Sequence, residues 1–290
     1  MKTVVLLFLI TANLSAQKVF CKKIKANQSH QLDNQLHETS GLIKFNNRFW
    51  THNDDTDCNL YALDTITGAI LETYKLPNKK NTDWEEIAQD ETHFYVGDFG
   101  NNAVGNRQDL HILKVAKQSV LERKPSIEHI DFSYSNQTDF ETQKPNQTNF
   151  DCEAMIVVGD SIFLFSKEWK SKQTTIYTLP KTAGKYSASK KNSFNIKGLV
   201  CGASFYEPKN QLALCGYTRN GRPFATVFSD FEGTNFFAGK NIKYKLKPRF
   251  QQIEAITTSD GKTYTITNEK LKFLWINRAQ KIHKFSFPSK

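Results

Sequence analysis

The sequence predicts an all-β protein of the β-propeller class, with five four-stranded blades. Short similar segments recur along the chain, and four of them carry a glutamate at the start of a β-type run: Glu38, Glu85, Glu153 and Glu254. A fifth segment has Gly202 in the acidic position. We call these five equivalent positions the slots, and consecutive slots lie 47, 68, 49 and 52 residues apart. Intervals of this length are typical of propellers and related repeat architectures.

Each interval divides into four short β-type runs separated by turn residues. In the first unit the runs are 41–45, 49–52, 60–64 and 70–76, with turns such as Asn46-Asn47 and Thr67-Gly68 between them. Four short antiparallel strands per unit are typical of a propeller blade. The same order is expected in the next three units, at 86–89, 93–97, 110–115 and 128–134, then 154–158, 161–165, 175–179 and 193–196, then 203–206, 211–216, 224–229 and 241–246.

The last unit is expected at 255–258, 263–267, 273–277 and 281–287, and the strand-like segment Lys18–Lys25 is expected to close the ring by joining it. A six-bladed ring is the alternative, with an unmarked blade in the 68-residue interval. The four tryptophans are expected to pack between blades. No apolar stretch with the 3.6-residue period of a long helix is present.

The first sixteen residues have the pattern of a secretory signal peptide. Lys2 is followed by the apolar run Val4–Ile10, and Ser15-Ala16 offers a small-residue cleavage site. No lipobox-like run precedes Cys21, and no later apolar run is long enough to span a bilayer. We therefore expect a single domain over 17–290, secreted or periplasmic, without a membrane span.

The formal net charge of +10 comes largely from dispersed lysines. Nucleic-acid binding would need arginines and aromatic residues concentrated on one element, and the sequence has no such cluster. The expected partner is a small molecule, glycan or protein at the channel mouth of a monomer, and a mild attraction to anionic glycans, phosphates or lipid surfaces stays open.

The five cysteines leave at least one thiol unpaired. Cys201 could pair with Cys215 across a hairpin, or with Cys152 on the neighbouring blade, and these two pairings exclude each other. Buried free thiols are the third reading. No Cys or His spacing indicates zinc.

The repeated glutamates predict a cation site on the propeller axis. The first strand of each blade lines the central channel, so Glu38, Glu85, Glu153 and Glu254 would form a broken acidic ring with its gap at Gly202. Confined carboxylates favour a hard cation with oxygen ligands, calcium first. The alternative is that each glutamate caps backbone amides or pairs with a lysine.

The second strands end at the same rim. There Asn53, Asp98 and Asn268 could complete a calcium shell, whereas Lys167 and Tyr217 could bind an anion or act as acid–base groups. Arg107 could reach the same pocket from the loop that precedes it. The candidate catalytic residues are therefore Lys167, Arg107 and Asp98, although Asn, Asp and Gly at these positions are also ordinary turn formers.

Several of these segments together resemble one group of exported bacterial proteins. The segments are Glu38-Thr39-Ser40-Gly41-Leu42, Asp83-Trp84-Glu85-Glu86-Ile87-Ala88, Gly97-Asp98-Phe99-Gly100-Asn101-Asn102 with Arg107, Asp151-Cys152-Glu153-Ala154-Met155 with Ser166-Lys167, and Gln252-Ile253-Glu254-Ala255. In this order they resemble the SdiA-regulated and esterase-like-phytase group of secreted propellers. The resemblance implies a calcium-associated propeller whose biochemical activity is unestablished. Gly202 and Phe99 depart from the pattern of that group.

Two functions follow from these observations. The first is a secreted binding or scaffolding propeller with a structural cation in its channel. The second is a calcium-dependent hydrolase of phosphoesters or lactones, in which Lys167 and Arg107 clamp an anionic group. A lectin-like module is disfavoured because the tryptophans do not recur at one repeat position.

Overall fold

The computed structural model describes residues 20–288, and these residues form an all-β protein. The expected signal peptide lies outside the described residues. The described helices are two 3-10 turns (Asn34–Leu36 and Glu207–Lys209) and the five-residue α1 (Lys117–Leu121). None of the described helices is long and apolar enough to cross a membrane.

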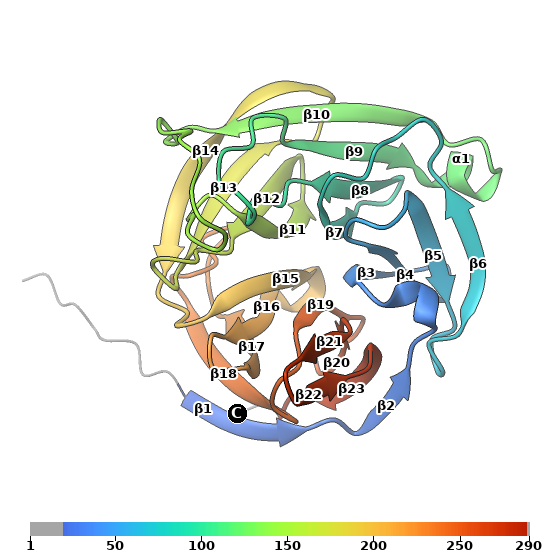
Figure 1. Ribbon diagram of the computed structural model, residues 1–290, viewed down its shortest axis with the longest axis vertical. Coiled ribbons are helices and arrows are strands. Elements are labelled where there is room, and N and C mark those ends of the chain that lie inside the picture. Colours follow the sequence, from blue (N-terminus) through green and yellow to red (C-terminus); the bar gives the residue numbers. More distant parts are fainter. Residues whose placement is uncertain (1–19, 289–290) are drawn as a thin grey trace, which may run out of the picture.

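Most of the strands fall into five groups around a common centre (Figure 1). The first group is β3 (Thr39–Phe45), β4 (Arg48–Asn53), β5 (Asn59–Leu63) and β6 (Ile70–Lys75). The next three are β7 (Trp84–Gln89), β8 (His93–Asp98), β9 (His111–Ala116) and β10 (Ile127–Tyr134), then β11 (Cys152–Val158), β12 (Ser161–Ser166), β13 (Thr174–Pro180) and β14 (Gly184–Phe194), then β15 (Leu199–Tyr206), β16 (Gln211–Thr218), β17 (Arg222–Ser229) and β18 (Lys240–Lys247).

Within these four groups the strands pair antiparallel in chain order, and their bounds lie close to the predicted runs. One strand differs: β14 begins at Gly184, nine residues before the predicted start at 193. Its outer position explains the error, because most of its side chains are exposed and the apolar alternation is absent. β14 also pairs in parallel with β10, which joins the second and third groups into one eight-stranded sheet.

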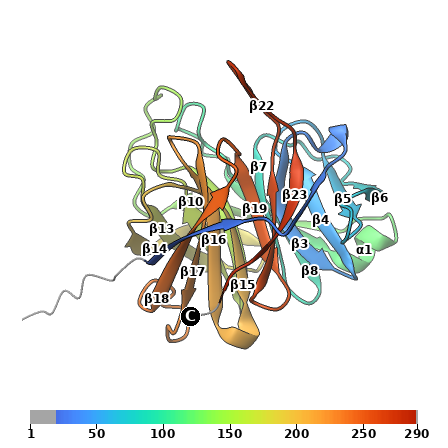
Figure 2. The same cartoon turned by 90° about the horizontal axis from the view of Figure 1, so that it is seen from below.

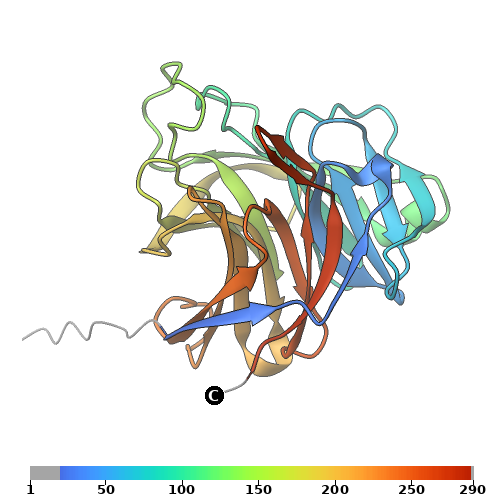
Figure 3. The same ribbon diagram turned by 60° about the horizontal axis from the view of Figure 1, so that its bottom comes forward.

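The last group is completed from the amino-terminal side of the chain. It contains β19 (Ile253–Thr258), β20 (Thr263–Asn268), β23 (Lys281–Ser286) and β2 (Gln28–Gln31), which pairs antiparallel with β23. The prediction that Lys18–Lys25 joins the last group is wrong, because β1 (Phe20–Lys25) pairs in parallel with β18 of the fourth group. Figure 3 shows β1 and β2 running along the outside, where they link the fourth and fifth groups.

The predicted strand at 273–277 is also wrong. This segment forms a separate two-stranded hairpin, β21 (Leu271–Phe273) and β22 (Ile276–Arg278), inserted between β20 and β23.

Apolar side chains pack in the layers between neighbouring sheets. Trp50, Phe94 and Trp84, for example, are fully buried in one cluster between the first and second groups. Alternate strand residues point into these layers because successive side chains of a strand face opposite sides. This packing fixes the groups side by side around the centre.

The innermost strands β3, β7, β11, β15 and β19 contact one another in a closed ring. At the ends where these strands finish, residues from all five line a cavity of about 140 Å³. We call the opposite end, where the five strands begin, the mouth. The repeated acidic residues lie at the mouth.

Candidate cation site at the mouth of the central axis

A β-bulge marks the same place in four of the five innermost strands. The extra residue is Glu85 in β7, Glu153 in β11, Cys201 in β15 and Glu254 in β19. A bulge locally re-aims the side chain of the extra residue. Repetition of this irregularity is therefore what brings these four side chains to the centre.

The pairing register corrects the predicted slots in two groups. In β15 the slot holds Cys201, whereas Gly202 pairs normally with Cys215 of β16. In β3, the pair Thr39–Asn53 is equivalent to the pair Ile253–Asn268 of the last group. Ser40, which follows Thr39, therefore corresponds to Glu254. Glu38 lies two positions before Ser40. Sequence spacing could not reveal the slot in β15, because a bulge shifts the register by one residue without changing the residue pattern.

Gly202 has a packing role instead of leaving a gap in a ring. A Cβ added there would lie 2.8 Å from the Glu254 carbonyl oxygen and 3.0 Å from the Ala255 Cα. Glycine therefore permits β15 and β19 to approach closely beneath the mouth.

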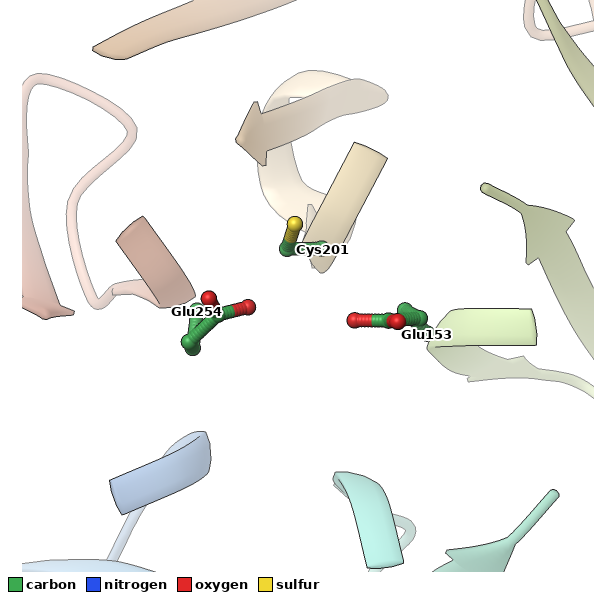
Figure 4. Close-up of side chains that lie close together, drawn as sticks. All are labelled: Glu153, Cys201 and Glu254. Carbon is green, nitrogen blue, oxygen red and sulfur yellow. The ribbon is translucent and has the colours of Figure 1, made fainter. Parts of the chain in front are cut away.

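Glu153, Cys201 and Glu254 converge on the centre from three neighbouring strands, as Figure 4 shows. One ligand atom from each lies within 4.8 Å of the others, and all three residues are buried. Burial raises the pKa of the Cys201 thiol well above its ordinary value, and nearby Glu254 adds to this effect. A neutral thiol is a poor partner for a hard cation.

A second cluster consists only of carboxylates. Oxygens of Glu85, Asp151 and Glu153 lie within 4.8 Å of one another, again from buried residues. Asp151 is held in place by two donors at 2.7 Å, the backbone N–H of Asn101 and the indole Nε1–H of Trp169. Such an all-oxygen donor set suits a hard divalent cation.

Lys167 supplies the positive charge within this cluster. Its Nζ lies 2.6 Å from Glu153 Oε1, and both side chains are almost completely buried. Burial lowers the pKa of Lys167, but the neighbouring carboxylates Glu153 and Glu254 contribute to raising it well above the ordinary value. Lys167 also lies 5.1 Å from the ring centroid of Trp169 and 5.4 Å from that of Tyr217.

Glu85 is the one carboxylate of this cluster without a direct partner. Its side chain is 5% exposed and makes no hydrogen bond or ion pair with any described residue. Burial raises its pKa well above the ordinary value, and the charges of Glu153 and Asp83 raise it further. Asp83 lies beside it against Gly100, and burial and Asp151 raise the Asp83 pKa to about 6.

The adjacent residue, Glu86, is satisfied by the backbone. Its carboxylate accepts N–H bonds from Ala203 of β15 at 3.0 Å and from Ile87 at 3.1 Å. The backbone amides of Leu42 in β3 and Met155 in β11 also interact with it. Glu86 thus links four of the five innermost strands, a role that the sequence did not indicate.

Glu38 belongs to a separate, outer cluster. It is half-buried, and its carboxylate lies within 4.8 Å of those of Asp54 and Asp55. Burial and the charges of Glu38 and Asp55 raise the pKa of Asp54 to about 8. Among the described carboxylates, Glu38 is therefore not grouped with Glu85 and Glu153.

The amide nitrogens of Asn53 and Asn268, two residues predicted to complete a calcium shell, donate to nearby loops, whereas the Asn53 Oδ1 is buried and has no hydrogen-bond partner among the described residues. The Asn53 Nδ2 donates to the Gln35 carbonyl at 2.8 Å and to Asp57 at 3.0 Å. The Asn268 Nδ2 donates to the carbonyls of Glu269 and Ala279, and its Oδ1 lies 2.8 Å from His283 Nε2.

Asp98 and Arg107 are paired with each other. The Arg107 guanidinium lies 2.8 Å from Asp98 Oδ1 and donates to the Gly100 carbonyl at 2.9 Å and to Asp109 at 3.0 Å. Asp98 Oδ2 also accepts the backbone N–H of Thr82 at 3.0 Å. The two residues thereby fasten the loop after β8.

Sequence reasoning missed Asp83, Asp151 and Cys201. A signal for the two aspartates was present, because Asp83-Trp84-Glu85 and Asp151-Cys152-Glu153 share an Asp-x-Glu pattern at equivalent positions. All five cysteines are free thiols in the structure, and Cys152, Cys201 and Cys215 are buried.

A comparison with protein-family models and one with curated proteins gave no match to this chain.

Proposed function

We propose that the protein is a secreted five-bladed β-propeller that binds calcium, or a similar hard divalent cation, at the mouth of its axis and serves as a binding or scaffold module. The five groups of strands, their ring of innermost strands and the bulge repeated in four of them support the propeller assignment. The described residues offer no sixth group that would favour the six-bladed alternative.

The unpartnered Glu85 carboxylate carries the cation proposal. A buried carboxylate without a donor is costly unless it is protonated or coordinates a cation. Glu85, Asp151 and Glu153 provide three carboxylates against the one ammonium of Lys167, which leaves two uncompensated negative charges before Asp83 and Glu254 are counted. A divalent cation balances that excess.

The donor set distinguishes between candidate metals. The cluster of Glu85, Asp151 and Glu153 contains only oxygen ligands, which favours calcium over zinc or copper. The other cluster includes the Cys201 thiol and shares Glu153, so the two clusters compete for one ligand. The all-carboxylate cluster is therefore the proposed calcium site.

Titration calorimetry with calcium tests this proposal. We expect one site per chain at pH 7.5, and Glu85→Gln should weaken calcium binding by at least about tenfold because ligand charge sets affinity. The matched control is Glu38→Gln in the outer cluster, which should leave this site unchanged. Loss of binding in the control but not in Glu85→Gln would contradict the proposal.

A hydrolase is the second candidate, and the position of Lys167 is what favours it. Lys167 lies within the carboxylate cluster and is paired there with Glu153. Arg107, the other predicted cation, is paired with Asp98 outside the cluster. A bound cation would act there as a Lewis acid. Calcium-dependent turnover of a phosphoester or lactone panel that is lost in Lys167→Met, with calcium binding retained, would support this candidate over the scaffold.

A further inference from the structure

The hairpin β21–β22 carries an exposed apolar tip. Phe273, Leu274 and Trp275 are 60%, 83% and 79% exposed, and they are consecutive in the chain. Figure 2 shows the hairpin projecting beyond the rest of the molecule. Single exposed apolar residues are common on protein surfaces, whereas a contiguous apolar patch on a protruding element is typical of an interaction site.

The backbone conformation of the tip is also unfavourable for the residue found there. Leu274 has a φ of +49°, a left-handed conformation in which hairpin turns favour glycine, asparagine or aspartate. A leucine there is both strained and solvated, so neither turn formation nor core packing accounts for it. Trp275 corrects the expectation that all tryptophans pack between blades, since its nearest described ring is Phe250 at 5.9 Å.

Basic residues surround this tip. Lys270, Lys272, Arg278 and Lys281 lie between positions 270 and 281, and no acidic residue occurs in that stretch. The exposed Arg219 and Arg249 line a neighbouring pocket that also contains Leu271, Phe273 and Ile276. Glu269, which accepts a hydrogen bond from Gln252, is the acidic residue directly before the stretch.

We propose that the β21–β22 hairpin is a membrane-surface anchor that inserts Phe273, Leu274 and Trp275 into the interface of an anionic lipid bilayer. Aromatic and aliphatic side chains enter the headgroup–acyl boundary, while adjacent lysines stay with anionic headgroups. A convex tip suits a bilayer better than a grooved protein partner. A second copy of the chain is disfavoured because it would bring two basic hairpins together.

The anchor also orients the molecule. The hairpin follows β20, which ends at the mouth, where the Glu269 N–H donates to the Gln252 carbonyl at 3.1 Å. With the tip in the bilayer, the mouth faces the lipid surface. This anchor is independent of the cation site.

Vesicle binding tests the proposal, with a chelator present so that the cation site does not contribute. The purified protein should sediment with phosphatidylglycerol–phosphatidylcholine vesicles and much less with pure phosphatidylcholine. The emission of Trp275 should shift to the blue and be quenched by brominated lipid, and Trp275→Phe should remove this change. Trp50 and Trp84 are already fully buried, so they should not respond.

Two variants and one matched control separate the contribution of the apolar tip to vesicle binding from that of the lysines. Phe273→Ser/Leu274→Ser keeps the fluorescent reporter and should weaken vesicle binding by at least about tenfold. Lys270→Gln/Lys272→Gln should weaken binding to anionic vesicles by about fivefold per residue. The control Ile66→Ser/Leu71→Ser removes apolar residues exposed to 63% and 50% on another group of strands, and it should bind normally.

Circular dichroism and urea unfolding verify that each variant is folded. The proposal is overturned by an absence of vesicle binding, or by binding that survives the tip variant. It is equally overturned if sedimentation velocity shows self-association that depends on the tip while vesicles are not bound.

Discussion

Glu85 and Glu86 are neighbours in the chain and both are buried, yet their surroundings are opposite. Backbone amides from several innermost strands surround the Glu86 carboxylate, whereas the Glu85 carboxylate faces other acids. The bulge at Glu85 in β7 brings the two side chains into these different surroundings. Glu86 thus holds the strands together, whereas the Glu85 carboxylate is left without a hydrogen-bond donor and could bind a cation.

The largest expected effect is a difference in the free energy of unfolding when each of these two glutamates is replaced by alanine. Glu86→Ala should lower the free energy of unfolding by roughly 3–5 kcal/mol, because it leaves several buried N–H groups without an acceptor. Glu85→Ala in calcium-free buffer should cost less than about 1 kcal/mol, since it relieves repulsion among acids. Urea unfolding of both variants measures the difference, and equal losses would refute the distinction.

The next effect concerns the lysine that neutralises the cluster. Lys167→Met should destabilise the metal-free protein at pH 7.5 by roughly 3 kcal/mol, because Glu153 loses its buried partner. Calcium should restore more stability to this variant than to the native protein, since the cluster gains one negative charge. Thermal unfolding with and without calcium checks this, and a calcium-independent loss would argue against a shared site.

The smallest effect is a dependence of stability on pH. The pKa values of Asp83, Glu153 and Asp54 are raised to about 6, 7 and 8, above the usual carboxyl range, so these groups bind more protons in the folded state. Their stabilising contribution is complete below the unfolded-state pKa of about 4 and is lost as pH rises through the folded values. The metal-free protein should therefore lose stability from pH 6.5 to 8.

Competing titrations act at the two ends of that interval. The pKa values of the buried His52 and His283 are lowered to about 4 by burial, so their opposing contribution fades as pH rises through the unfolded-state pKa of about 6.5. Lys117 and Lys243, whose pKa values burial lowers to about 8, act in the opposite sense above it. Calcium should flatten the slope between pH 6.5 and 8, and a rise of stability in this interval would contradict the account.

The sequence predicted the strand groups well where residues alternate between core and solvent. It failed for β14 and for the β21–β22 hairpin, whose side chains are largely exposed and carry no alternation. The closing strand was also misplaced, because the partner of an edge strand depends on how the chain wraps around the outside.

For the site, Glu85, Glu153 and Glu254 were predicted and do lie at the mouth. Asp98 was predicted from its position at the end of a second strand, and in the structure its carboxylate is paired with Arg107. Cys201 takes the slot given to Gly202, because a bulge decides which of two adjacent residues faces the centre. Ser40 takes the slot given to Glu38, because the pairing register of β3 places Glu38 two positions before it.

Anomalous diffraction from crystals soaked in Mn²⁺, a hard cation that carboxylates bind, tests the central claim most directly. We predict one strong peak among the carboxylates of Glu85, Asp151 and Glu153, and no such peak in Glu85→Gln. A peak confined to Glu38, Asp54 and Asp55, or an unchanged peak in Glu85→Gln, would contradict the account.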